Sequence, residues 1–408
     1  MTPLFACRSC GARTVEPVLS LGELPLVNAL VDPQELEPDP RYPLDVVRCT
    51  HCTLVQITES VPPEALFRVY SYFSSYSETF VEHARQFAAT RVSELGLGES
   101  SLVVEAASND GYLLDWFARA GVPVLGIEPA RNVADVARAR GIETIAEFLD
   151  PELAERVVRE RGHADLVVAN NVLAHVPDLH GFVAALATLA GDRGLVSVEV
   201  PYLRDLVDRL EFDTIYHEHL SYFTLTSLLP LLEAHGFSVT RAERLLVHGG
   251  SLRIVASRSG GVGETVEPLL AEEKNWGVGA SERFDGFARS VETLRGDVHE
   301  LVAGLVSAGA DVAAYGAAAK GVVLANSCGL DSTLVRFVVD RNPHKQGKLL
   351  PGVRIPVEAP EYLLREQPAY CLLFAWNLTT EILEQQQAYV GLGGKFIVPV
   401  PTPHVLAA

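Results

Sequence analysis

The chain has 408 residues, of which 48% are hydrophobic, and its formal net charge is −19. This length predicts two or three domains with buried cores, and the composition excludes a largely disordered chain. The acidic excess argues against a protein that binds nucleic-acid backbones, because such proteins present basic surfaces. No apolar run reaches the ~18 residues of a membrane helix, and residues 1–7 lack the basic and apolar segments of a secretion signal. We therefore expect a cytoplasmic protein that binds neither nucleic acid nor membrane.

Four of the six cysteines form two Cys-x-x-Cys pairs, Cys7 with Cys10 and Cys49 with Cys52. Two short knuckles of this spacing can place four thiolates around one Zn²⁺ ion. Ordinary thiols or two disulfides are the alternatives, and zinc is favoured because cytosolic thiols stay reduced. The first ~65 residues are rich in turns and too small to fold on apolar burial alone. A metal with four thiolate ligands has no open position, so we expect this zinc to be structural.

A central α/β pattern begins near Ser101 and continues to about Ser257. Apolar runs alternate with helical stretches and are expected as buried parallel strands; they are 102–105, 124–128, 165–169 and 195–199. A helix over 226–235 then precedes two further strands, 237–246 and 251–257, which flank Gly249-Gly250. This pair predicts an antiparallel hairpin at the edge of the sheet.

The C-terminal part begins with a glycine-rich segment, 260–263, which we interpret as a linker. A long amphipathic helix follows, with apolar residues at helical spacing from Phe284 to Leu305. Four further strands close the chain, at 311–315, 335–340, 370–375 and 395–400. The predicted fold is therefore α/β with three domains: a small zinc-binding domain (1–68), a central Rossmann-like domain (69–262) and a C-terminal Rossmann-like α/β domain (263–408).

The loop after the first central strand, 105–111, begins with an acidic residue and continues with small residues into a helix. Nucleoside-binding sites begin in this way at the carboxyl edge of a parallel sheet, although the G-x-G-x-x-G form is absent. Glu128 ends the next strand about 20 residues later, where a carboxylate can accept both ribose hydroxyls; a solvated strand end is the alternative. Asn170 and Asn171 follow a third strand and should face the same crevice. Together these features predict a nucleoside cofactor.

A dinucleotide and S-adenosylmethionine are both compatible with such an edge. The expected antiparallel hairpin favours S-adenosylmethionine, because a reversed last strand characterises the methyltransferase variant of this architecture, whereas dinucleotide folds usually stay parallel.

A polar cluster, Tyr216-His217-Glu218-His219, follows the last parallel strand, with Tyr222 close behind it. Its neighbours are apolar and aromatic, so we expect the cluster to be partly buried, although a solvated loop is the alternative. A histidine oriented by a carboxylate suits a general base near neutral pH. Tyrosine hydroxyls can stabilise an enolate oxygen.

Two other segments are candidates for binding. Residues 70–76 form a run of aromatic and hydroxyl side chains that either packs at a domain join or roofs the crevice. Residues 315–321 follow a strand and open a helix, with Lys320 near the helix start. Free amides and this lysine can hold a diphosphate; tight packing of a helix on a sheet is the alternative.

The combined motifs resemble the zinc-containing sugar C-methyltransferases of antibiotic deoxysugar pathways, which act on TDP-linked 4-keto sugars. The likeness covers nearly the whole chain. It rests on the two Cys-x-x-Cys pairs and on the segments 72–76, 108–112, 170–176, 216–219, 248–253 and 316–321.

The resemblance implies a class I methyltransferase domain in the centre and a C-terminal domain that helps to hold the nucleotide sugar. It implies that His219 is the catalytic base. The other catalytic residues expected on this basis are Glu218, Tyr216, Tyr70 and His175. The expected cofactor-binding residues are Glu105, Ser108, Asn109, Asp110, Gly111, Tyr112, Glu128, Asn170, Asn171, Tyr72 and Tyr76. Those expected to bind the substrate are Tyr222, His248, Ala319 and Lys320.

The hypothesis is therefore S-adenosylmethionine-dependent C-methylation of a TDP-linked 4-keto-deoxysugar, with C-3 favoured over C-5. His219 removes a proton next to the ketone, and the resulting carbanion attacks the methyl group. The alternatives are a nicotinamide-dependent nucleotide-sugar oxidoreductase and a non-catalytic zinc-ribbon binding protein. A monomer is compatible with the sequence, which fixes neither the oligomeric state nor the other substituents of the sugar.

Overall fold

The structure is a computed structural model that describes residues 5–35, 37–67 and 73–406, apart from the side chains of residues 65, 67 and 248. The chain divides into two compact units. Unit 1 comprises Met1–Glu16, Val47–Arg204 and Leu220–Ala280, and unit 2 comprises Pro17–Val46, Asp205–His219 and Ser281–Ala408. The three-domain boundaries expected from the sequence stay a prediction.

The main sheet of unit 1 has the strand order β10-β11-β8-β7-β4-β5-β6. Its strands are β4 (Val103–Ala106), β5 (Val124–Ile127), β6 (Thr144–Ile145), β7 (Leu166–Asn170), β8 (Leu195–Pro201), β10 (Ser238–Leu245) and β11 (Ser251–Ser257). The five adjacent strands β6, β5, β4, β7 and β8 are parallel. Strand β11 runs antiparallel to both β8 and β10. The expected parallel strands and the reversed hairpin are thus confirmed.

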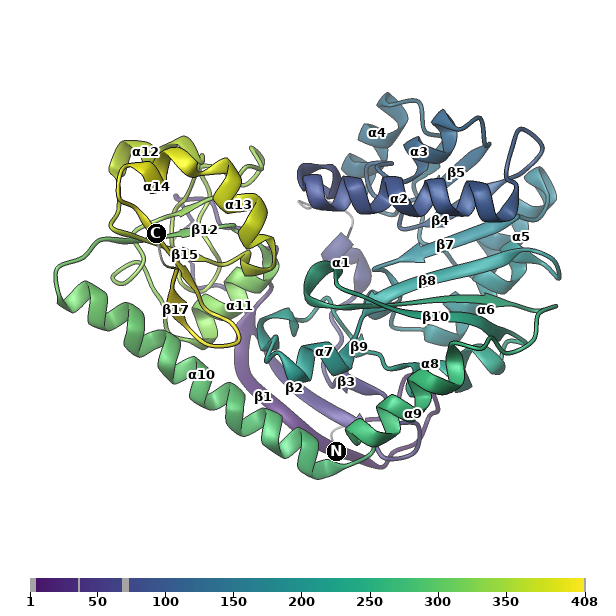
Figure 1. Ribbon diagram of the computed structural model, residues 1–408, viewed down its shortest axis with the longest axis horizontal. Coiled ribbons are helices and arrows are strands. Elements are labelled where there is room, and N and C mark those ends of the chain that lie inside the picture. The colour runs from purple at the N-terminus through teal and green to yellow at the C-terminus, as the bar shows by residue number, and fades with distance from the viewer. Residues whose placement is uncertain (1–4, 36, 68–72, 407–408) are drawn as a thin grey trace. The chain divides into compact units, whose positions relative to one another are not determined.

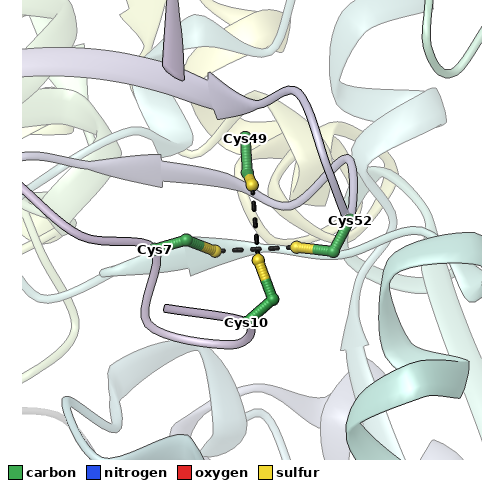
Figure 2. Close-up of side chains that lie close together, drawn as sticks. All are labelled: Cys7, Cys10, Cys49 and Cys52. Atoms are coloured by element: carbon green, nitrogen blue, oxygen red, sulfur yellow. Dashed lines mark hydrogen bonds between the residues drawn. The ribbon is translucent and has the colours of Figure 1, made fainter. Parts of the chain in front are cut away.

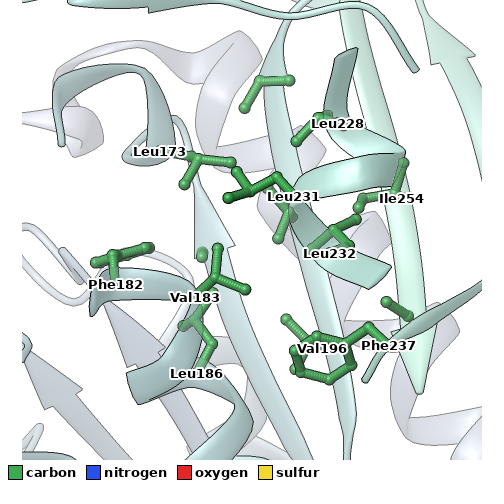
Figure 3. Close-up of a cluster of buried hydrophobic side chains, with 14 of the residues drawn as sticks. Leu173, Phe182, Val183, Leu186, Val196, Leu228, Leu231, Leu232, Phe237 and Ile254 are labelled. Atoms are coloured by element: carbon green, nitrogen blue, oxygen red, sulfur yellow. The ribbon is translucent and has the colours of Figure 1, made fainter. Parts of the chain in front are cut away.

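Alternating side chains of this sheet enter two hydrophobic cores, because successive residues of a strand point to opposite faces. Val103 packs with α2 (Glu78–Leu95), α3 (Leu114–Arg119) and α4 (Arg131–Ala139). Val104 packs on the other face with α5 (Pro151–Arg161), α6 (Leu179–Ala190) and α8 (Leu225–Glu233). Figure 1 shows the helices on both sides of the sheet, and Figure 3 shows part of the second core around Val183, Leu231 and Phe237. Both faces are covered, so the inner parallel strands β4, β5 and β7 consist mostly of apolar residues.

Short helices complete unit 1. They are α1 (Pro63–Phe67), η1 (Ser74–Tyr76), η2 (Leu173–His175), η4 (Val247–Gly249) and α9 (Val266–Trp276). Helix α9 supplies Glu273, a buried carboxylate that accepts hydrogen bonds from Leu225 N and Thr226 N (both 2.7 Å) and from the Tyr202 hydroxyl (2.9 Å). This carboxylate satisfies free amides at the start of α8, where its charge also complements the helix dipole.

The N-terminal sheet has the strand order β1-β2-β3-β9. Its strands are β1 (Val15–Pro25), β2 (Arg41–Cys49), β3 (Val55–Ile57) and β9 (Ser221–Tyr222). The sequence suggested a turn-rich segment with only short apolar runs, and this is wrong for β1 and β2. In β1 the buried residues are spaced by three, as at Val18, Leu21 and Leu24. This spacing departs from the period-two alternation that identifies strands in sequence, and Gly22, with φ +74°, is a further irregularity within the strand.

Unit 2 is built on a sheet of order β14-β13-β12-β15-β16-β17, parallel except for β17. The strands are β12 (Val312–Tyr315), β13 (Val338–Val339), β14 (Val357–Glu358), β15 (Tyr370–Leu373), β16 (Lys395–Val398) and β17 (His404–Val405). The helices are α7 (Leu203–Asp208), which begins in unit 1, then η3 (Phe212–Thr214), α10 (Ser281–Ser307), α11 (Ala319–Ser327), α12 (Glu361–Glu366), η5 (Trp376–Leu378), α13 (Thr379–Gln385) and α14 (Gln387–Gly391). The predicted C-terminal α/β fold and the predicted long helix, α10, are therefore confirmed. In the described parts of the chain, no helix combines the length and the apolar character that crossing a bilayer requires.

A buried ion pair joins two neighbouring strands of unit 1. Glu199 of β8 lies opposite Arg253 of β11, and two guanidinium nitrogens contact Glu199 Oε2 at 2.6 and 2.9 Å. His83 of α2 lies 3.2 Å from the same carboxylate. Burial alone would raise the pKa of Glu199, but the hydrogen bond from His83 and the charge of Arg253 outweigh burial and lower it to about 2.

We expect Arg253→Met to destabilise the protein by about 3–5 kcal/mol, because it leaves a buried carboxylate without its cation. The control Arg241→Met breaks surface ion pairs of β10 with Glu94 and Glu243 and should cost less than about 1 kcal/mol. Urea unfolding at pH 7 measures both. The contribution of Glu199 should be present above the pKa of an unfolded glutamate and disappear as the pH falls toward 2. Equal midpoints for the two variants would contradict this account.

Candidate functional site

The four paired cysteines converge in unit 1 (Figure 2). Their Sγ atoms all lie within 4.8 Å of one another, with Cys7–Cys52 at 3.6 Å and Cys10–Cys49 at 3.5 Å. Four sulfurs placed tetrahedrally about 2.3 Å from a zinc ion would be about 3.8 Å apart. These distances fit zinc and exceed the ~2.05 Å of a disulfide bond. The cysteines are free thiols and could supply all four ligands, which leaves no position for a substrate.

Each pair of cysteines sits in a tight turn that ends in the left-handed conformation. Gly11 N donates to Cys7 O at 2.9 Å with φ +70° at Gly11, and Thr53 N donates to Cys49 O at 3.0 Å with φ +63° at Thr53. The first of these turns could be foreseen from Gly11. The second could not, because threonine rarely adopts this conformation.

A second polar region lies at the carboxyl edge of the unit 1 sheet. Strands β5 and β6 lie on one side of β4, and β7 and β8 lie on the other. Ligands bind in open α/β sheets at such a point, where the strand order reverses. The loops that follow β4, β5 and β7 carry most of the predicted cofactor residues, so the topology brings them to one edge.

The loop after β4 is held in an unusual backbone conformation. Ala107 and Asn109 have φ +54° and +50°, a strained arrangement that is concentrated at ligand sites. Asn109 Oδ1 accepts from Ser74 N at 2.9 Å, and Asp110 Oδ2 accepts from the Ser75 hydroxyl at 2.5 Å. The loop is thus tied to η1, which lies in the run of aromatic and hydroxyl side chains at residues 70–76.

Glu128 follows β5 and bridges two loops. Its carboxylate oxygens accept from Asn109 N at 2.9 Å and from Ala130 N at 2.8 Å. A carboxylate has about four acceptor positions, so these two backbone donors leave about two positions for other donors. Burial raises its pKa to about 7, although these two backbone hydrogen bonds lower it. Burial, with the nearby charges of Glu128 and Asp110, raises the pKa of Glu105 well above the ordinary value.

Several buried polar atoms at this edge have no hydrogen-bond partner among the described residues. They are Glu105 Oε2, Ser108 Oγ, Asp110 Oδ1 and Asn170 Oδ1. Such atoms are costly in a folded protein unless a ligand or water satisfies them. The edge therefore fits a nucleoside cofactor that brings hydrogen-bonding groups of its own.

The remaining predicted residues of unit 1 are placed as follows. Gly111 and Tyr112 continue the loop after β4, with Tyr112 stacked on Phe80, while Asn171 and His175 follow β7. Tyr76 is 39% exposed at the end of η1. Tyr222 is buried in β9. Tyr70 and Tyr72 lie outside the described residues, as does the side chain of His248.

The polar cluster Tyr216–His219 belongs to unit 2 and is mostly buried, as expected. His219 is only 9% exposed. Its Nδ1 lies 2.9 Å from the carbonyl oxygen of Thr214, and its Nε2 lies 2.9 Å from the Tyr216 hydroxyl. A carbonyl oxygen only accepts, so Nδ1 carries the proton. In the neutral ring Nε2 is then the basic nitrogen, and Tyr216 donates to it.

The group that orients His219 differs from the expected one. At Nδ1 it is the backbone carbonyl of Thr214, where the sequence suggested a carboxylate. The carboxylate of Glu218 instead accepts from Asn28 Nδ2 at 2.7 Å. The neighbouring His217 contacts the carbonyl oxygens of Tyr42 and Pro43, both at 3.2 Å. Glu218 directly precedes His219, and a neighbouring side chain need not reach the histidine ring. Thr214 lies five positions before His219, and the backbone between them brings its carbonyl oxygen to the ring.

The small-residue segment of unit 2 forms the end of β12 and the start of α11, as the sequence suggested. Ala319 is the first residue of α11, and the Lys320 ammonium lies 4.4 Å from the centre of the Trp376 ring. Trp376 follows β15, which is paired with β12, so both side chains lie where the strand order of this sheet reverses.

Sequence reasoning missed Ser75, Thr214, Asn28 and Trp376 as members of these sites. Ser75 lies in the run at residues 70–76, from which only the tyrosines were predicted as site residues. The others have no local signal, because Thr214 acts through its backbone and Asn28 and Trp376 are distant in sequence from their partners.

We expect Cys49→Ser to reduce the zinc content well below one ion per chain and to lower the unfolding temperature, because a structural zinc stabilises the segment that binds it. The control Cys328→Ala removes a buried thiol of α/β unit 2 and should leave the zinc content unchanged. Metal analysis of both purified variants measures the zinc content per chain and tests this expectation. Full zinc content in Cys49→Ser would exclude Cys49 as a ligand.

Three family models match the chain in sequence order. A zinc binding domain matches residues 7–67, a methyltransferase domain matches 80–242, and a C-methyltransferase C-terminal domain matches 246–401.

Known proteins show similarity of different extent. A ubiquinone biosynthesis O-methyltransferase of Bordetella avium is 31% identical over 23% of this chain and 40% of its own. The solved magnesium protoporphyrin IX methyltransferase of Synechocystis aligns with 45% of this chain and 82% of its own at 20% identity and a TM-score of 0.34. The C-methyltransferase NovU of Streptomyces niveus is 40% identical over 100% of this chain and 98% of its own. The chain therefore belongs to the same family as NovU and is an S-adenosylmethionine-dependent C-methyltransferase with a zinc-binding N-terminal segment.

Proposed function

We propose that this C-methyltransferase acts on a TDP-linked 4-keto-deoxysugar and methylates C-3, with Nε2 of His219 as the base. The sugar substrate is supported by the motif resemblance to deoxysugar C-methyltransferases. The base is supported by one observation above all, the pair of hydrogen bonds at the His219 ring.

The chemistry requires a base and a stabilised oxygen. A sugar C–H bond is inert, but a hydrogen next to the C-4 ketone can be removed when the enolate oxygen is stabilised by hydrogen bonds. S-Adenosylmethionine, when bound, supplies an electrophilic methyl group for the resulting carbanion. The protein's residues must therefore hold the sugar, remove the proton and stabilise the oxygen.

His219 suits proton removal because its protonated nitrogen is fixed. The Thr214 carbonyl keeps the proton on Nδ1 and stabilises the imidazolium that forms when Nε2 takes the substrate proton. The Tyr216 hydroxyl lies 2.9 Å from Nε2. The C–H group of the substrate would take this place beside Nε2 during the reaction. In the proposed reaction, Tyr216 turns from Nε2 toward the ketone oxygen.

The other predicted residues are proposed to line the substrate. Glu218, held by Asn28, is assigned to a sugar hydroxyl. Tyr70, His175, Tyr222 and His248 are kept as candidates for the ketone oxygen or the sugar. Lys320 and the start of α11 at Ala319 are proposed to bind the diphosphate, since α11 offers free amides and Lys320 adds a positive charge.

The cofactor is proposed to bind at the carboxyl edge of the unit 1 sheet. Glu128 would accept the ribose hydroxyls there, with Glu105, Ser108, Asn109, Asp110, Gly111 and Tyr112 in the adjoining loop, Asn170 and Asn171 after β7, and Tyr72 and Tyr76 in the run at residues 70–76. The unsatisfied buried atoms of this edge support the proposal.

We expect His219→Asn to lower the turnover of a TDP-linked 4-keto-deoxysugar by at least about 100-fold, the usual scale for loss of a general base. Binding of S-adenosylhomocysteine should remain within a factor of about two, because His219 is not among the proposed cofactor residues. The control His299→Asn removes an imidazole whose Nδ1 also contacts a backbone carbonyl at 2.9 Å, that of Cys328, and it should retain activity. Turnover near the wild-type value in His219→Asn would remove His219 from the role of base.

The pKa of Glu128 predicts a pH dependence of cofactor binding. Below about pH 7 the carboxyl becomes protonated and loses its negative charge, so its hydrogen bonds to ribose hydroxyls should weaken by about 1 kcal/mol. We expect the Kd of S-adenosylhomocysteine to rise about fivefold from pH 8 to pH 6 in calorimetry. Glu128→Gln should bind more weakly at pH 8 and show little change over this range. The same pH dependence in Glu128→Gln would assign the titration to another group.

A further inference from the structure

A short turn in unit 2 joins the proposed base to a buried carboxylate. This turn, η3, contains Thr214, whose carbonyl contacts His219 Nδ1 at 2.9 Å. The preceding residue, Asp213, is fully buried, and its Oδ2 accepts a hydrogen bond of 2.6 Å from Trp376 Nε1. Consecutive residues of one turn therefore contact the base and an indole of η5.

The backbone of this turn makes few hydrogen bonds of its own. It is a single 3-10 turn with the backbone bonds Thr214 N to Glu211 O and Ile215 N to Phe212 O, each 3.0 Å. Hydrogen bonds in such short helices have poorer geometry than those of an α-helix, so side-chain contacts also help to hold the turn in place. The carboxylate of Asp213 supplies an anchor, since a hydrogen bond to an ionised acceptor is about twice as strong as a neutral one.

The environment of Asp213 favours a firm contact. Burial raises its pKa to about 6, while the nearby Lys320 ammonium and the Trp376 N–H lower it, so the group is mainly ionised above pH 7. Lys320 also lies over the ring of Trp376 at 4.4 Å. The indole is thus in contact with a cation on its face and a carboxylate at its N–H, and both restrict its position.

We propose that Asp213 and Trp376 are positioning residues, which hold η3 so that the Thr214 carbonyl keeps the proton of His219 on Nδ1 and leaves Nε2 basic. This inference rests on the proposed role of His219 as the base. Neither residue is proposed to touch the substrate through its carboxylate or its indole N–H. If the anchor is lost, the Thr214 carbonyl can shift, and a shift of about 1 Å at a catalytic group can cost about 100-fold in rate.

The test uses single substitutions in the zinc-loaded full chain. Trp376→Phe keeps an aromatic ring and removes the N–H, and Asp213→Ala removes the acceptor. Asp213→Asn keeps an oxygen that can accept from the indole. The control Trp116→Phe makes the same chemical change in unit 1, where Arg119 lies over the ring at 4.9 Å.

We expect Trp376→Phe and Asp213→Ala to lower kcat about 100-fold, with the KM of the sugar and the Kd of S-adenosylhomocysteine changed less than threefold. Asp213→Asn should regain at least tenfold over Asp213→Ala. Trp116→Phe should keep the wild-type kcat. If Asp213→Ala does not fold, Trp376→Phe and Asp213→Asn still give the comparison.

A second readout is independent of catalysis. ¹⁵N NMR of histidine-labelled protein reports which ring nitrogen carries the proton, and the His219 signals are those missing from His219→Asn. Wild type should show a protonated Nδ1 and an unprotonated Nε2, and Trp376→Phe should show a mixture of the two tautomers. An unchanged protonation pattern in folded Trp376→Phe would overturn the inference, whatever happens to kcat. A changed pattern, together with full activity of His219→Asn, would preserve the positioning role and refute the base.

Discussion

In the proposed mechanism, proton removal depends on the hydrogen bond between His219 Nδ1 and the carbonyl oxygen of Thr214. An imidazole has two nitrogens, and only a fixed partner at one of them makes the other a defined base. A carbonyl performs this task well, because it cannot donate and has no charge that titrates. The position of the Thr214 carbonyl depends on the turn that contains it, and this turn, η3, has only three residues. The buried contact of Asp213 with Trp376 gives that turn a link to the sheet of unit 2.

The carboxyl edge of the unit 1 sheet, where we propose that the cofactor binds, is held together differently. Glu105, Asp110 and Glu128 gather there in a buried region, which raises the pKa of Glu105 and Glu128 and destabilises their charged forms. Burying acidic groups together costs stability unless they have hydrogen-bond donors. The backbone amides of Asn109 and Ala130 supply two donors, and a bound nucleoside would supply more. The zinc site is separate from this chemistry, since four thiolates can bind the metal and hold the N-terminal knuckles together.

Sequence reasoning predicted the regular parts of the fold and the residues whose chemistry is local. The strands β4, β5, β7 and β8 are continuous apolar runs, and the hairpin β10–β11 is marked by a glycine pair, so both could be predicted. Strand β1 could not be predicted, because its buried residues do not alternate. The expected strand at 335–340 is reduced to Val338–Val339. The cysteine cluster was accessible because its spacing identifies it, and the loop at Glu105–Gly111 was accessible because it follows a strand and leads into a helix. The partner of His219 was not, since a backbone carbonyl has no residue type, and the contact of Asp213 with Trp376 joins positions 163 residues apart.

The most direct test of the central claim is solvent deuterium exchange at the sugar carbon, without methyl transfer. The wild-type protein is incubated in D₂O with S-adenosylhomocysteine and a TDP-linked 4-keto-deoxysugar, and the deuterium at C-3 is followed by NMR and mass spectrometry against an enzyme-free sample. The account predicts that the wild type accelerates this exchange and that His219→Asn does not. Acceleration by His219→Asn equal to that of the wild type would show that another group removes the proton.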